Sequence, residues 1–350
     1  MPLETVVWPR VGELVDQSGK LSDLVAHRVH LIAARRWREQ GRPIDADLVE
    51  LERLAAVKRL AAPVLLSRIR RVYDGPAMLL KGAEVAARYP APELRPYTDL
   101  DLLVPDAPAV YRQLVEAGFE KTPMPGPYEH HHQPALTWPG LPMLLELHSQ
   151  PSWPDWLTPP DNDQLFAGAT GECALGCGVL GPSRVHHTLL LVAHAWRDAP
   201  LARLGHLLDV YVTCLNEDPG ELADLAAAWR IDRLWRSTLA AVGGVLGGER
   251  PRASVRALTR QLDSMRERTV IETKLADWVA PFWGLPFPRA VRASGSELVA
   301  ELRPEHNETW RRKLHRSGTA MRQLFRSRSE RDELLRRETA PPADHADAPH

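Results

Sequence analysis

Residues 77–104 read AMLLKGAEVAARYPAPELRPYTDLDLLV and outline the centre of the fold. The run begins with four apolar residues that predict a short strand, followed by Lys81-Gly82 and a helical stretch at residues 83–89. Residues 98–104 then alternate polar and apolar side chains, which predicts a second strand. The order strand, helix, strand is typical of an α/β unit.

The pattern continues with one more helix and two more strands. Residues 105–119 predict a helix, and residues 134–138 and 143–148 predict strands joined at Pro139-Gly140. If that dipeptide centres a tight hairpin, Glu146 lies opposite Gln133, to within two residues of register. His148 then lies opposite His131, so that residues 130–132 fold back over Glu146.

Helical patterns flank this unit on both sides. Residues 21–73 predict helices that begin at an N-cap Ser22 and end before Asp74-Gly75-Pro76. Residues 184–247 return to helical spacing, and an arginine-rich helix is expected over residues 304–338. The last residues, 339–350, have a composition typical of disorder.

Composition excludes several classes of protein. The chain has 350 residues, a net charge of -1 and a charged fraction of 25%, which argues against a protein that coats nucleic acid or a membrane. Three cysteines cannot form a disulfide framework. No secretory signal and no apolar run of about 18 residues is present, so a cytoplasmic location without membrane contact is expected.

Asp99 and Asp101 are the first candidate site residues. Alternate residues of a strand face the same side, so the two carboxylates share one face while Leu100 and Leu102 share the other. Two neighbouring carboxylates repel unless a cation lies between them, and Mg²⁺ prefers such oxygen ligands together with substrate phosphates. Two solvated aspartates on an edge strand are the alternative.

Three residues near this strand could bind phosphate. Gly82 lies between a strand and a helix start, where backbone N–H groups favour anions. Lys81 offers a point charge, and Arg95 precedes the carboxylate strand.

The strand at residues 143–148 adds a third carboxylate. Glu146 and His148 share one face, and His148 could orient Glu146, act as a base, bind phosphate or be a plain structural histidine. The histidines at 130–132 are either a solvated loop or, with His148, a zinc site.

Together, the Lys-Gly pair, Asp-x-Asp and the Glu-Leu-His strand resemble the polymerase-β-type nucleotidyltransferase superfamily. More closely, residues 77–148 resemble the bacterial uncharacterised nucleotidyltransferase family. The resemblance implies that Asp99, Asp101 and Glu146 are catalytic and hold two Mg²⁺ ions, with Mn²⁺ as a substitute. It implies that Lys81 and Gly82 bind the triphosphate, and we group Arg95, His148 and His131 with them as nucleotide-binding candidates.

The expected fold is therefore α+β, a small nucleotidyltransferase sheet flanked by helices. We expect an N-terminal helical segment at 1–74, a catalytic domain at 75–182, a helical domain at 183–338 and a disordered tail at 339–350. The expected activity is Mg²⁺-dependent transfer of a nucleoside monophosphate from an NTP to a hydroxyl or phosphate of an acceptor, with release of pyrophosphate. A small molecule or peptide is favoured as acceptor over nucleic acid.

Two other functions stay open. The superfamily usually has Ser or Gly where this chain has Ala83, which favours a non-catalytic module that binds a nucleotide or partner. The arginine-rich tail, which is otherwise a solvated helix face, would suit transfer onto RNA. His186, His187 and His194 lie in an apolar helical stretch and are expected to be satisfied core or interface histidines.

Overall fold

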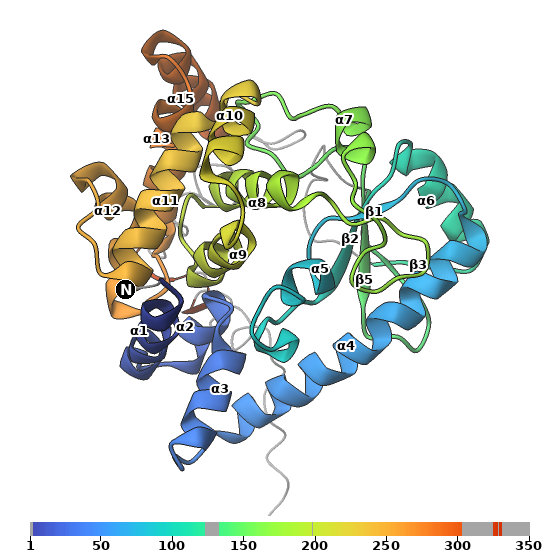
Figure 1. The fold of residues 1–350 in the computed structure, drawn as a ribbon, viewed down its shortest axis with the longest axis horizontal. Helices are drawn as coiled ribbons and strands as arrows, with labels where there is room; N and C mark the ends of the chain where they lie inside the picture. Colours follow the sequence, from blue (N-terminus) through green and yellow to red (C-terminus); the bar gives the residue numbers. More distant parts are fainter. Residues whose placement is uncertain (1–2, 123–132, 198, 303–324, 328, 331–350) are drawn as a thin grey trace, which may run out of the picture.

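The chain folds as an α+β protein in which one small sheet is surrounded by many helices (Figure 1). The computed structural model describes residues 3–122, 133–197, 199–302, 325–327 and 329–330. The predicted tail at 339–350 and nearly all of the arginine-rich stretch at 304–338 therefore lie outside the described residues. Among the described helices, none has both the length and the apolar character that crossing a bilayer would require.

Within the described residues, five strands form one mixed sheet with the spatial order β1-β2-β5-β4-β3. The strands are β1 (Met78–Leu79), β2 (Asp99–Leu103), β3 (Glu120–Lys121), β4 (Leu136–Thr137) and β5 (Leu144–His148). Strands β2 and β5 are parallel, and all other neighbouring pairs are antiparallel. The two longest strands thus lie side by side at the centre of the sheet.

The predicted hairpin is confirmed, with a shift in its register. Leu136 pairs with Leu145 and Thr137 with Leu144. This register is shifted by two residues from the predicted one, in which Glu146 lies opposite Gln133. The displacement lies within the expected tolerance and keeps every side chain on its predicted face, because the side-chain period of a strand is two. The short edge strand β3 was not predicted, since two exposed charged residues carry no strand signal.

Helices lie before, between and after the strands in the chain and cover both faces of the sheet. Those before and within the sheet are α1 (Leu3–Gln17), α2 (Leu21–Ala26), α3 (His30–Glu39), α4 (Ala46–Val72), α5 (Ala83–Ala86), the 3-10 turn η1 (Pro92–Leu94) and α6 (Ala107–Glu116). Those after it are α7 (Asn162–Ala167), α8 (Arg184–Arg197), α9 (Leu204–Cys214), α10 (Pro219–Ala228), α11 (Asp232–Gly247), α12 (Ala253–Thr259), η2 (Arg260–Ser264), α13 (Val270–Val279), α14 (Pro281–Gly284) and α15 (Phe287–Leu302).

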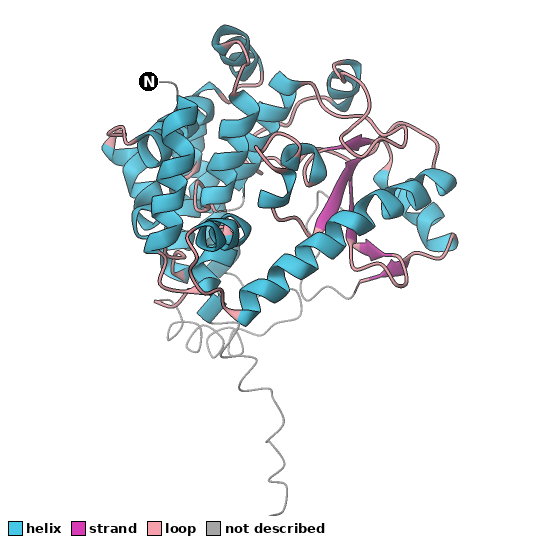
Figure 2. Ribbon diagram, turned by 60° about the horizontal axis from the view of Figure 1, so that its bottom comes forward, coloured by secondary structure: helices cyan, strands magenta, loops and turns pink. Residues whose placement is uncertain are grey.

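One face of the sheet packs against α4 and α6. Leu100 and Leu102 of β2, with Leu145 and Leu147 of β5, are buried in a core that also contains the second half of α4. Asp45 caps α4 by accepting from the backbone of Asp47, and the helix ends at Val72, before the predicted turn. Figure 2 shows α4 as the long helix that crosses beside the strands.

The other face of the sheet meets a helical bundle. Leu103 of β2, with Met78 and Leu80 near β1, belongs to a second core built mainly from α8, α9 and α11. Helix α1 joins this core through Val7, Val11, Leu14 and Val15, whose spacing forms one helical stripe. Helix α1 lies within the helical segment expected at 1–74, although the helical patterns read from the sequence began only at residue 21. Within the predicted N-terminal segment, therefore, α1–α3 pack with the bundle whereas α4 packs with the sheet.

Candidate active site

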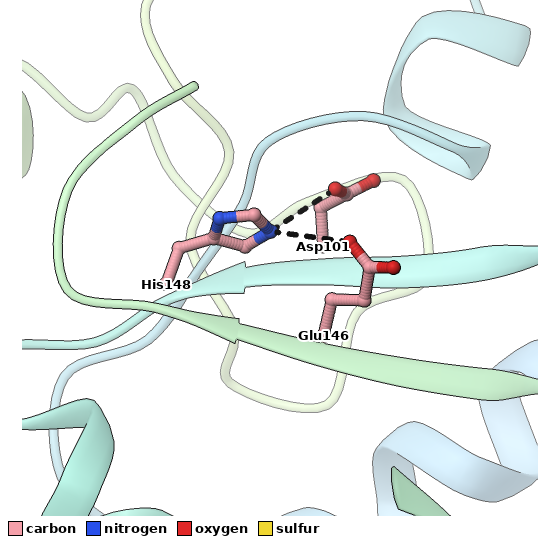
Figure 3. A group of neighbouring side chains, drawn as sticks. All are labelled: Asp101, Glu146 and His148. Carbon is pink, nitrogen blue, oxygen red and sulfur yellow. Dashed lines mark hydrogen bonds and ion pairs between the residues drawn. The ribbon is translucent and has the colours of Figure 1, made fainter. Parts of the chain in front are cut away.

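The parallel pairing of β2 and β5 brings two carboxylates side by side. Asp101 pairs directly with Glu146, and Leu103 pairs with His148. Paired residues in adjacent strands project from the same face, so Asp101, Glu146 and His148 all lie on the face turned toward the bundle. Figure 3 shows the two carboxylates and the imidazole pointing toward one another.

Asp101 is the most enclosed acid of the site. It is 2% exposed, and its Oδ1 accepts from Lys81 Nζ at 2.9 Å and from His148 Nε2 at 3.1 Å. Burial alone would raise the pKa of this carboxyl, but the Lys81 charge and the His148 bond outweigh burial and lower the pKa below its ordinary value. Asp101 is therefore an anion held by two donors.

Glu146 and His148 complete a group that could hold a metal ion. His148 Nε2 lies 3.8 Å from Glu146 Oε2, and one ligand atom from each of Asp101, Glu146 and His148 lies within 4.8 Å of the others. Glu146 is the most accessible of the three, with 24% of its side chain exposed. Two carboxylates on one side of a divalent ion, with substrate phosphates on the other, is the arrangement that Mg²⁺ uses in phosphoryl-transfer sites.

Asp99 lies two residue pairs away from Asp101 along β2, on the same face of the sheet. It pairs with Leu144, is only partly buried, and is not a member of the group around Asp101. Burial and the neighbouring charge of Asp101 raise the pKa of Asp99 above its ordinary value, against the lowering effect of Lys81 and Arg28. The predicted Asp99 and Asp101 pair thus shares a face, while the closest contacts join Asp101 to β5.

The turn between β1 and α5 places Lys81 over Asp101. Gly82 has φ 65° and ψ -119°, a conformation that favours glycine. A Cβ at this position would lie 3.3 Å from the carbonyl oxygen of Asp99, so the turn packs closely on the start of β2. The backbone N–H of Leu80 also donates to the Asp101 carbonyl at 3.0 Å. These contacts fix where the Lys81 side chain begins.

Arg95 is not directed at this group of acids. Its guanidinium makes a bidentate ion pair with Asp209 of α9, with Nε–Oδ1 and Nη2–Oδ2 distances of 2.8 Å, and its Nη1 donates to the Gly82 carbonyl at 3.0 Å. Tyr89 donates to the same carboxylate at 2.8 Å. Although burial opposes the charge, Asp209 raises the pKa of Arg95 above its ordinary value. Arg95 therefore joins the Gly82 turn to the bundle.

Helices α8 and α9 carry three buried histidines, His187, His194 and His206. The Nε2 of His187 donates to the Leu80 carbonyl at 2.9 Å, as expected of a satisfied core histidine. His194 and His206 differ, because neither ring nitrogen of either residue bonds to any described residue. Asp209 and His206 were not among the predicted site residues, because both lie within the apolar helical stretch expected at residues 184–247. His131 lies outside the described residues.

Comparison with known proteins places the chain in a family. No curated protein and no solved structure matches it. A family model described as "uncharacterised nucleotidyltransferase" matches residues 16–246, a span that contains the whole sheet, the group around Asp101 and the Arg95–Asp209 ion pair. The description of the family implies transfer of a nucleoside monophosphate as the general class of reaction. The chain belongs to the uncharacterised nucleotidyltransferase family.

Proposed function

We propose that the protein is a divalent-metal-dependent enzyme that transfers a nucleoside monophosphate from an NTP to a hydroxyl or phosphate of a small-molecule or peptide acceptor. The new bond joins the acceptor oxygen to the α-phosphorus, the bond to the β-phosphate oxygen breaks, and pyrophosphate leaves. The observation that carries the proposal is the direct pairing of Asp101 with Glu146 across parallel strands. The family match supports the same class of reaction.

The acids of the site fit Mg²⁺, with Mn²⁺ as a substitute. Asp101 and Glu146 offer oxygen ligands from one face, and Asp99 adds a third carboxylate along the same strand. When bound, the ions neutralise the phosphate charge that develops during transfer. Since His148 Nε2 already donates to Asp101, we assign His148 to the orientation of the carboxylate rather than to metal binding.

Lys81 and Gly82 are assigned to the phosphates. The Lys81 ammonium lies 2.9 Å from Asp101 on a flexible four-carbon chain, so it can exchange this contact for a phosphate oxygen when substrate arrives. Gly82 lets the backbone make the close turn from which Lys81 extends. We assign Arg95 to the support of that turn, because its donors are directed at Asp209 and the Gly82 carbonyl. Nucleotide binding by His131 stays a prediction.

A labelling experiment tests the activity. The purified chain is incubated with each labelled NTP, Mg²⁺ or Mn²⁺ and a cell extract, and both label transfer and pyrophosphate release are measured. Glu146→Gln is the key variant, because Glu146 is part exposed and its replacement by an amide of equal size spares the fold. We expect a loss of at least about 10³-fold, of the order seen when an essential charge-stabilising group is removed.

The matched control is Glu120→Gln, an exposed acid on the edge strand β3 of the same sheet. It should keep the full transfer rate. Equal activity in the Glu146→Gln and unmodified proteins would overturn the assignment of the acids.

A non-catalytic nucleotide-binding module is the second candidate. Ala83 at the turn and the direct contact of Lys81 with Asp101 favour it. Titration with Mg-NTP separates the two functions. Tight binding without pyrophosphate release over a broad panel of acceptors would support the module and reject the enzyme.

A further inference from the structure

Two histidines from adjacent helices form a buried pair beside the candidate active site. His194 of α8 and His206 of α9 are both buried, and their ring centroids are 4.9 Å apart. None of their four ring nitrogens bonds to a residue that the structure describes. A buried polar group without a partner costs about 1–3 kcal/mol. Packing alone therefore gives no reason for histidine at both positions.

Contacts of neighbouring residues on α8 and α9 indicate that the pair lies on the side of the bundle that meets the sheet. His187 precedes His194 by two helical turns on the same face of α8, and it bonds to the Leu80 carbonyl next to Lys81. Asp209 follows His206 by one turn on α9, and it holds Arg95. The two imidazoles thus lie where the bundle meets the turn that carries Lys81.

The charges around the pair favour an anion. Burial lowers the pKa of both imidazoles well below its ordinary value, and Lys81, Arg28 and Arg203 lower it further. A metal ion would meet the same repulsion from these cations. A neutral imidazole, in contrast, has an N–H that can donate to an anion. Arg28 makes no ion pair within the part of the chain that the structure describes, and its charge also acts on Asp99.

We propose that His194 and His206, together with Lys81 and Arg28, bind a phosphate group of the substrate on the bundle side of the Asp101 site. The proposal rests on the proposed function, because it assigns the group to the triphosphate of the NTP or to a phosphate on the acceptor. Lys81 connects the Asp101 site with the histidine pair, since its ammonium contacts Asp101 and its charge lowers the pKa of both histidines. Incoming phosphate would give the N–H of each imidazole an oxygen acceptor and the cations a counter-charge.

Calorimetric titration of the full chain tests the site. The probes are inorganic tripolyphosphate, a Mg-NTP and inorganic phosphate, and the variants are His194→Leu and His206→Leu. Leucine fills a similar volume and removes the unpaired nitrogens, so the variants should melt no lower than the unmodified protein. We expect each to bind tripolyphosphate about 10- to 100-fold more weakly, the effect of losing a hydrogen bond to a charged group.

Two further variants make the result decisive. His186→Leu is the matched control, because His186 lies on the same helix but stacks against Trp229 and should keep full affinity. Arg28→Asn removes a cation at a partly exposed residue with φ 59°, a conformation that asparagine tolerates well. It should fold and should weaken binding in the same direction, even if the buried variants unfold.

The outcomes identify the source of the phosphate and separate the two proposals. Weaker binding of tripolyphosphate and NTP assigns the site to the nucleotide, whereas weaker binding of inorganic phosphate alone assigns it to the acceptor. Unchanged affinity for all three probes, or no binding by the unmodified protein, overturns the site, even if nucleotidyl transfer is found. Histidine-dependent binding without any transfer would support the site and reject the proposed enzyme.

Discussion

The ion pair between Arg95 and Asp209 should be one of the strongest single determinants of stability. Arg95→Met and Asp209→Leu each remove one partner and leave the other charge buried, since the two side chains are only 5% and 6% exposed. Breaking a buried pair in this way costs about 3–5 kcal/mol. Arg95→Met also removes the bond to the Gly82 carbonyl, which adds about 1 kcal/mol.

Replacing both partners should cost less than the sum. In the double variant no buried charge is left alone, and apolar side chains of similar volume fill the space. We therefore expect the double variant to be no less stable than either single variant, which is a large departure from additivity. Against a total stability of about 5–15 kcal/mol, each single change removes a substantial fraction.

Equilibrium unfolding in urea measures the free energy of unfolding of the unmodified protein, the two single variants and the double variant. A loss of about 4 kcal/mol moves the midpoint down by roughly 1–2 M at the slope typical of a chain this size. Arg236→Met is the control, because the Arg236–Asp232 pair is 70% and 45% exposed and should contribute at most about 1 kcal/mol. Single changes that cost under about 1 kcal/mol, or a double variant equal to their sum, would refute the buried-pair argument. The folded double variant also tests Arg95 in nucleotide binding, since unchanged NTP affinity would leave only its structural role.

Three further predictions concern the site and its supports. Asp101→Asn should abolish nucleotidyl transfer, which a pyrophosphate-release assay measures. Unlike Glu146→Gln, it should also lower the melting temperature by the equivalent of about 1–3 kcal/mol, because it weakens the contacts to Lys81 and His148; a thermal melt measures this loss. Gly82→Ala should destabilise by about 1–2 kcal/mol, since alanine is strained at φ 65° and its Cβ meets a backbone oxygen at 3.3 Å; a chemical melt checks this. Burial lowers the pKa of His187 to about 3. The contribution of the neutral His187 to the free energy of unfolding is therefore complete above the ordinary pKa of 6.5, and it is lost as the pH falls toward 3. At pH 5 this loss is about 2 kcal/mol relative to pH 8, and His187→Gln should flatten the pH dependence of the urea midpoint.

Local patterns predicted much of the sheet. The alternation at residues 98–104 and 143–148 gave β2 and β5 with the correct faces, because the side-chain period of a strand is a local property. The turn after α4 was equally clear from Asp74-Gly75-Pro76. Helix α1 falls within the expected helical segment 1–74, but its bounds were not predicted, because Pro9 interrupts the helical pattern around the stripe from Val7 to Val15.

The site was predicted in part. The carboxylates Asp101 and Glu146 were singled out from the sequence, and the structure brings them together. Arg95 illustrates what local reasoning cannot find: its position before β2 suggested a phosphate contact, but its partner is 114 residues away on α9. The partner of Arg95 depends on how the core of the sheet packs against the core of the bundle, and the residues next to Arg95 in the sequence do not indicate this packing.

By itself, the sequence determined which side chains share a strand face and where the tight turn lies, and it singled out three acids, a lysine and a glycine as site candidates. Only the tertiary structure decided that β2 and β5 run parallel, which sets Asp101 against Glu146 while Asp99 lies two residue pairs away. It also decided that the bundle meets the sheet beside this site, where His187 bonds to the Leu80 carbonyl. The physical reason is that periodicity is fixed by the local backbone, whereas register between strands and the contact between two cores are fixed by burial summed over distant segments.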